Sequence, residues 1–285
     1  MKDLKALHIN WTLPSCPKQE SANYKMNDFE LLCMILSSLL WRKYNGSIKL
    51  YTDKVGYNYY KKLNILDLWD DGIDVDTLES ISEDFSPSIY WAAAKIFALQ
   101  AESFPVVILD TDMLVWKDLR KELADVQLAA FHRESIHTGC YISKKQLKKR
   151  SDYHFDSQWD WEEEPCNTAL AYFNNEAFKK YYTFSSIDFM NKNNDLPPDW
   201  VSQMVFAEQR IFSMCAKKME IPIHTFLQET YNGKCYDFTH LWGAKQVALK
   251  DSNYHQQLCQ SLMNAIHREF PQYKLSQEVI SSIRL

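Results

Sequence analysis

Two aspartates one residue apart are the strongest chemical feature of this sequence. Asp110 and Asp112 directly follow an apolar run, Val-Val-Ile-Leu, at 106–109. Side chains at positions i and i+2 of an extended segment point the same way, so both carboxylates are expected to face one volume. Their mutual repulsion is relieved when a cation lies between them. The spacing therefore predicts a binding site for a divalent metal.

The aspartate pair is also compatible with a structural role or with phosphatase chemistry. An aspartate that follows a strand often caps a turn. Alternatively, the chain is a haloacid dehalogenase-like phosphatase in which Asp110 is the nucleophile and Asp112 the general acid or base. In that class Thr or Val usually stands two residues after the second aspartate, where this chain has Leu114, and the motif usually opens the domain, whereas a long segment precedes Asp110 here. Both differences favour the metal site.

The elements that must position the pair are predicted by short apolar runs that alternate with helical patterns. This alternation is typical of an α/β fold with a mostly parallel sheet flanked by helices. We expect strands at 4–10, 47–52, 106–109, 126–132 and 138–143, and helices at 28–44, 57–63, 176–182 and 206–217. Ser86-Pro87 predicts the start of a further helix that runs to Leu99, because a capping hydroxyl before proline is a common helix N-terminus. In such sheets ligands bind beyond the carboxyl ends of strands, where Asp110 and Asp112 lie.

The composition excludes several classes of protein. The 285 residues carry a net charge of −5 with basic and acidic residues interleaved, so we expect no nucleic-acid partner. Seven scattered cysteines without a Cys-x-x-Cys pair argue against a disulfide framework and a zinc site. The start of the chain lacks an apolar stretch of signal-peptide length, and the longest apolar run, 29–41, is shorter than the ~20 residues of a membrane span. We expect a cytoplasmic protein with at most peripheral membrane contact.

The pattern becomes helical towards the C-terminus. Leu258, Leu262, Ile266 and Phe270 recur every four residues, which indicates one apolar helix face. We therefore expect two parts, a domain at 1–245 and a helical C-terminal extension at 246–285 that packs on it.

Four segments, taken in order, resemble the GT-A-type nucleotide-sugar glycosyltransferases, in particular the family 8 and family 32-like bacterial enzymes. Residues 88–119 resemble their helix, metal strand and following segment, and 165–169 is similar to their Phe-Asn-Ala-Gly segment without its glycine. Residues 207–212 are similar to Asp-Gln-Asp-x-Leu-Asn. Residues 239–245 are similar to His-x-x-Gly-x-x-Lys-Pro-Trp, one residue shorter and without Pro-Trp. The resemblance covers about residues 1 to 245 and implies a single GT-A (Rossmann-like) domain.

This resemblance implies a metal-dependent transfer of a sugar from a nucleoside diphosphate donor, such as a UDP-sugar, to a hydroxyl of a glycan or lipid-linked acceptor. Such enzymes commonly build surface polysaccharides or other glycans. The metal, Mn²⁺ or Mg²⁺, would be bound by Asp110, Asp112 and His240. The remaining donor contacts would come from Asp110 itself and from Asp53, Asn10, Lys95, Gly243 and Lys245. Lys245 would pair with the departing diphosphate. For these residues an ordinary structural role, as a turn cap, a surface lysine or a hydrogen-bonded histidine, stays open as the alternative.

Catalytic and acceptor-binding residues follow from the same resemblance. Gln209 would lie near the anomeric carbon of the sugar in a retaining reaction, with Glu208 as its charged neighbour. An inverting reaction would instead need a carboxylate base, for which Asp160, Glu162 and Asp237 are eligible. Trp159, Trp161 and Asn167 are expected to bind the acceptor, although aromatic residues of a long loop also form small cores of their own. A non-catalytic carbohydrate-binding module of the same fold stays open as a further alternative.

Overall fold

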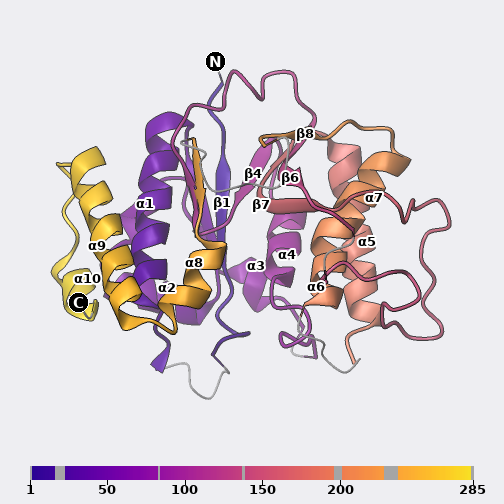
Figure 1. Cartoon of the computed structure of the whole chain (residues 1–285), viewed down its shortest axis with the longest axis horizontal. Helices are drawn as coiled ribbons and strands as arrows, with labels where there is room; N and C mark the ends of the chain where they lie inside the picture. The colour runs from indigo at the N-terminus through magenta and orange to yellow at the C-terminus, as the bar shows by residue number, and fades with distance from the viewer. Residues whose placement is uncertain are drawn as a thin grey trace.

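A mixed sheet of seven strands forms the centre of the protein, in the order β3-β2-β1-β4-β7-β6-β8 (Figure 1). The computed structural model describes residues 2–16, 23–82, 84–136, 139–195, 201–227 and 237–283. The strands are β1 (Ala6–Asn10), β2 (Ile48–Thr52), β3 (Ile73–Asp74), β4 (Val106–Leu109), β6 (Leu128–Arg133), β7 (Cys166–Phe173) and β8 (His224–Thr225). Neighbouring strands are parallel except that β7 runs antiparallel to β4 and β6. The predicted α/β class with a mostly parallel sheet is confirmed.

A second, two-stranded sheet lies next to the end of β4. It pairs β5 (Met113–Val115) with β9 (Phe238–His240) in antiparallel register, and Met113 lies opposite His240. The pairing is continued by hydrogen bonds on both sides, from Leu241 N to Asp112 O and from Trp116 N to Asp237 O. We refer to these paired strands as the β5–β9 ladder. It brings a segment from near the C-terminus against the aspartate pair.

Helices cover both faces of the large sheet (Figure 1). On one face lie α1 (Asp28–Tyr44), α8 (Trp242–Ala248), α9 (Ser252–Glu269) and α10 (Gln277–Ser282); on the other lie α4 (Ala93–Ala101), α5 (Glu176–Lys192), α6 (Ser202–Val205) and α7 (Ile211–Lys218). The short helices α2 (Lys54–Lys62), η2 (Leu66–Leu68) and α3 (Asp76–Glu79) follow β2 and β3, and the π-helix η3 (Phe206–Arg210) joins α6 to α7. Each face has its own apolar core, centred on α1 and on α4, α5 and α7. Burial of this apolar surface is the main force that holds the layers together.

Two predicted elements are wrong. The helix expected from Ser86 begins at Ala93, because the Ser86 hydroxyl bonds to that of Ser88 instead of capping a helix. The strand expected at 138–143 is not formed by its described residues, 139–143, which make a turn and loop. Their polar groups face η3: the Ile142 carbonyl accepts a hydrogen bond from Arg210. Two consecutive prolines, Pro197 and Pro198, predict a loop, and this segment lies outside the described residues.

The C-terminal helices are present as predicted. Helix α9 places Cys259, Leu262 and Ile266 in the core shared with α1. The predicted boundary at residue 246 falls inside α8, so the division into two parts stays a prediction. In the described part of the chain, no helix has the length and apolar character required to cross a membrane.

Candidate functional site

Asp110, Asp112 and His240 form one cluster in which the ligand atoms all lie within 4.8 Å of one another. Asp110 follows β4, Asp112 precedes β5, and His240 ends β9. The two strand ends are fixed by backbone hydrogen bonds, from Asp110 N to Ala169 O and from Leu241 N to Asp112 O. Two carboxylates and an imidazole form a donor set that suits Mn²⁺. The three predicted metal ligands are therefore brought together.

Two lysines pair with this cluster. The Lys95 ammonium lies 2.6 Å from Asp110 and 2.8 Å from Glu208. The Lys245 ammonium lies 2.9 Å from Asp112 and 3.5 Å from Glu30. Two lysines thus face four carboxylates, which leaves two negative charges without a cation among these contacts. A single divalent ion supplies the charge that is missing, so the residues present fit a metal site.

The protonation states of the three ligands also suit a metal. Burial raises the pKa of Asp110, and repulsion from Asp112 adds to this although Lys95 opposes it. Burial would raise the pKa of Asp112 as well, but Lys245, through its charge and its hydrogen bond, outweighs burial together with the neighbouring His240 and Lys95, so the pKa is lowered. Burial lowers the pKa of His240, which keeps the imidazole neutral with a lone pair to donate.

Glu208 and Gln209 lie in the π-helix η3, a type of helix often found at functional sites. Glu208 is 2% exposed, and its carboxylate accepts hydrogen bonds from Lys95 and, at 2.8 Å, from the Thr168 hydroxyl. The Gln209 side-chain oxygen accepts a hydrogen bond from Tyr141. Glu208 is thus a buried support of the cluster, whereas Gln209 is the less buried of the two residues.

Sequence reasoning missed Glu30, Tyr141 and Thr168, which contact the predicted site residues. Thr168 stands next to Asn167 in a segment that the sequence did single out. Nothing in the sequence marks Glu30 or Tyr141, because each reaches the site through the packing of an element distant in the chain.

Asp53 and Asn10 are engaged inside the protein. The Asp53 carboxylate accepts hydrogen bonds from the Thr12 backbone at 2.7 Å and from the Gly56 backbone at 2.9 Å, so it caps α2 and ties it to the segment after β1. The Asn10 amide donates to Tyr24 and Tyr60. Asp53 thus acts as a helix cap, and Asn10 as a hydrogen-bond donor to two tyrosines, which are the structural roles that the sequence left open. Their contacts with a nucleotide stay predictions.

Gly243 has no steric need for glycine, since an added Cβ would meet nothing within 4 Å. It is exposed at the start of α8, two residues before Lys245, whose ammonium pairs with Asp112. Open space above a glycine leaves room for a ligand and does not by itself indicate one. Lys245, which follows the shortened part of the motif, does reach the cluster.

The aromatic residues predicted to bind the acceptor pack into a core of their own. Trp159 is 6% exposed and donates to the Tyr181 hydroxyl at 3.2 Å. Trp161 stacks on Phe206 with ring centroids 5.4 Å apart. Trp159 is buried and Trp161 half-buried, which fits the alternative of a small core within the loop, and their contacts with an acceptor stay predictions. Asn167 lies in β7, and its amide donates weakly to Glu134 at 3.4 Å.

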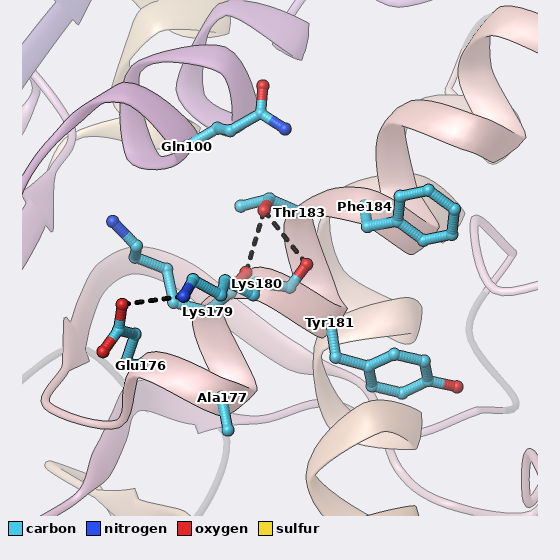
Figure 2. A pocket seen from close by; sticks show the side chains of 8 residues that line it. All are labelled: Gln100, Glu176, Ala177, Lys179, Lys180, Tyr181, Thr183 and Phe184. Atoms are coloured by element: carbon cyan, nitrogen blue, oxygen red, sulfur yellow. Dashed lines mark hydrogen bonds and ion pairs between the residues drawn. The ribbon is translucent and has the colours of Figure 1, made fainter.

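The hollow shown in Figure 2 is separate from this cluster. It has a volume of about 600 Å³ and lies along α5 and the end of α4, with Gln100, Lys179 and Phe184 among its lining residues. None of the predicted site residues lines it. Its location gives no support to a role in the chemistry of the aspartate pair.

Solved structures of glycosyltransferases are structurally similar to this chain. The galactosyltransferase LgtC, solved with donor and acceptor sugar analogs, is 12% identical over 98% of this chain and 100% of its own, with a TM-score of 0.49. Mouse xyloside xylosyltransferase 1 is 13% identical over 79% of this chain and 85% of its own, with a TM-score of 0.40.

A nucleotidyltransferase is also among the similar structures. The CTP:phosphocholine cytidylyltransferase of Streptococcus pneumoniae is 8% identical over 92% of this chain and 100% of its own, with a TM-score of 0.43. At such identities a structural similarity concerns the fold and not the reaction.

Comparison with curated proteins finds no match. A family model does match, and it spans almost the whole chain. Because the model of the family of unknown function DUF6734 matches residues 4–278, the chain belongs to that family.

Proposed function

We propose that this chain is a metal-dependent glycosyltransferase that moves a sugar from a nucleoside diphosphate donor, a UDP-sugar, to a hydroxyl of an acceptor. The observation that carries the proposal is the cluster of Asp110, Asp112 and His240, whose ligand atoms lie within 4.8 Å of one another at the end of a sheet strand. A donor that binds beyond the carboxyl end of β4, as ligands of such sheets commonly do, would reach these ligands. We further propose retention of configuration, with Gln209 beside the anomeric carbon.

A divalent ion, Mn²⁺ or Mg²⁺, bound by the three residues would neutralise the negative charge of the diphosphate as it leaves the sugar. The protein's own groups then have distinct tasks. Lys245 has a hydrogen left beyond those it gives to Asp112 and Glu30, and it would donate this to the departing diphosphate. Lys95 holds Asp110 and Glu208 in fixed positions. Tyr141 fixes the side chain of Gln209.

The acceptor is proposed at the level of its chemistry, a glycan or lipid-linked hydroxyl in polysaccharide or glycan synthesis. Asn167 in β7 remains a proposed acceptor contact. Asn10 and Asp53 remain proposed nucleotide contacts at the ends of β1 and β2, and a cytoplasmic location remains part of the proposal.

The test is release of nucleoside diphosphate from a panel of UDP- and GDP-sugars with Mn²⁺, for the wild type and for Asp112→Asn. We expect metal-dependent release for at least one donor and a loss of about a hundredfold or more in Asp112→Asn, because the variant removes a charged ligand. Full activity in Asp112→Asn would show that the metal assignment is wrong.

Companion assays with other substrates distinguish the other reaction classes. Release of pyrophosphate from a nucleoside triphosphate would identify a nucleotidyltransferase. A burst with a generic aryl phosphate, or trapping by beryllium fluoride, would identify a phosphatase with Asp110 as nucleophile. Binding of sugar without any turnover would identify a carbohydrate-binding module. Each of these results would replace the proposed sugar transfer.

A further inference from the structure

His8 is a fully buried histidine in the middle of β1, with 0% of its surface exposed. Its Nε2 lies 3.1 Å from the Ser37 hydroxyl on α1, and its Nδ1 lies 3.4 Å from the indole nitrogen of Trp69. Ser37 in turn donates to the Met113 carbonyl at 2.7 Å. A series of hydrogen bonds therefore runs from Trp69 through β1 and α1 to the first residue of β5.

The direction of each hydrogen bond in this series follows from its two ends. The Met113 carbonyl has no hydrogen, so the single hydroxyl hydrogen of Ser37 must point at it. Ser37 then accepts from His8, which requires a hydrogen on Nε2. Trp69 can only donate, so Nδ1 carries the lone pair. The imidazole is thus neutral, and burial, which lowers the pKa of His8 to about 3, keeps it so.

The last acceptor lies at the metal cluster. Met113 follows Asp112 in the chain and lies opposite His240 in the β5–β9 ladder. Ser37 and Met113 are 1% and 0% exposed, so water does not compete for this hydrogen bond. Polar groups in such an apolar layer cost free energy unless they are paired, and apolar side chains would fill the same space without that cost. The series thus ends at the backbone that carries two of the three ligands.

We propose that His8 and Ser37 are positioning residues that hold the β5–β9 ladder, and through it the spacing of Asp112 and His240. The inference deepens the proposed function and rests on it for the identity of the metal. Partners that orient metal ligands from behind typically change metal affinity by 10- to 100-fold when they are removed. Here the orientation acts through the Met113 carbonyl and not through a ligand side chain.

The test uses the full chain and compares Ser37→Ala with Ser213→Ala. Ser213 is the control, because it is 0% exposed on α7 and donates to the Arg210 carbonyl three residues before it. Ser38 would not serve as a control, because its hydroxyl lies 3.4 Å from Nδ1 of His8. Amide hydrogen exchange of residues 113–115 and 238–240 is measured without metal, and the dissociation constant of Mn²⁺ is measured by calorimetry with UDP present. For Ser37→Ala we expect exchange about tenfold faster in these residues and Mn²⁺ binding about tenfold weaker. Ser213→Ala should leave both within about twofold of the wild type.

Two outcomes overturn the inference. Wild-type exchange of the β5–β9 ladder in Ser37→Ala overturns it, and so does equal loosening in both variants, which would mean a general loss of packing. If Ser37→Ala fails to fold, Ser37→Cys keeps the volume with a weaker donor and should show the same changes at smaller size. If the wild type binds no Mn²⁺, the proposed function fails, whereas the exchange comparison still decides whether Ser37 holds the ladder.

Discussion

At the scale of single residues, Lys95 is the contact on which the cluster depends most. Its ammonium joins Asp110 to Glu208, and its side chain is 16% exposed. Replacing it by methionine leaves two buried carboxylates without their cation. We expect Lys95→Met to lower the free energy of unfolding by about 3 kcal/mol at neutral pH without metal, as measured by urea denaturation.

The control for this prediction is Lys54→Met. Lys54 pairs with Glu79 at 3.5 Å, but its side chain is 72% exposed, so the loss should stay below about 1 kcal/mol. Equal effects of the two substitutions would mean that Lys95 contributes no more than a surface ion pair.

The aspartate pair could be predicted from the sequence because its geometry is local: two residues at the end of one strand share a direction. Lys95 and Lys245 were predicted to lie near the donor, but their pairing with Asp110 and Asp112 was not. That pairing depends on how α4 and α8 pack, which no local pattern encodes. The sequence left open whether Trp159 lies in a small core or faces an acceptor. In the structure it is buried against Tyr181 and Phe206, and no local pattern encodes these contacts.

At the scale of elements, the joint between β1 and α2 depends on Asp53. Its carboxylate accepts hydrogen bonds from the backbone of Thr12 and Gly56, and also from the Thr12 hydroxyl at 2.8 Å. We expect Asp53→Ala to lower the free energy of unfolding by about 2 kcal/mol, because it removes a helix cap and leaves buried donors unpaired. Urea denaturation measures this loss.

Asp251→Ala is the matched change. Asp251 caps α9 through Asn253 and Tyr254 at an exposed position, so the cost there should be about 1 kcal/mol. An unchanged stability of Asp53→Ala together with weaker UDP binding would instead assign the carboxylate to the nucleotide.

Element boundaries show where sequence patterns stop being informative. The strands β1, β2 and β4 were predicted because their residues are apolar and bounded by turn residues. The helix expected at Ser86 is not capped there, because the Ser86 hydroxyl bonds to the Ser88 hydroxyl. In the segment expected as a strand at 138–143, Tyr141 donates to Gln209 and the Ile142 carbonyl accepts from Arg210. Contacts with an element distant in the chain, as in this second case, are not encoded in a local strand pattern.

At the scale of the whole molecule, a charged network on β1 and β2 ties these strands to the segment before β4. Glu102 bonds to Lys5 and Lys49, each at 3.1 Å, and to the Tyr51 hydroxyl. Burial alone would raise the pKa of Glu102, but hydrogen bonds from the Ser103 backbone and from Lys49, Tyr51 and Lys5 lower it to about 2. The carboxylate therefore stabilises the fold while it is ionised.

The sign of the pH dependence follows from this lowered pKa. The ordinary pKa is near 4.5, so the stabilisation is complete above about pH 4.5 and is lost as the pH falls towards 2. We expect Glu102→Gln to cost about 2 kcal/mol at pH 7 and progressively less below pH 4.5. Urea denaturation at a series of pH values measures this difference. A constant difference between pH 7 and 2.5, or a similar cost for the exposed Glu164→Gln, would contradict the assignment.

The central claim, a donor site assembled on Asp110, Asp112 and His240, is tested most directly by thermal unfolding with UDP, with Mn²⁺, and with both. Because a ligand that binds the folded state raises the melting temperature, we predict a rise with UDP and Mn²⁺ together that exceeds the sum of their separate effects. The rise should disappear in Asp112→Asn. No rise with both ligands present, or an equal rise in Asp112→Asn, would contradict the account.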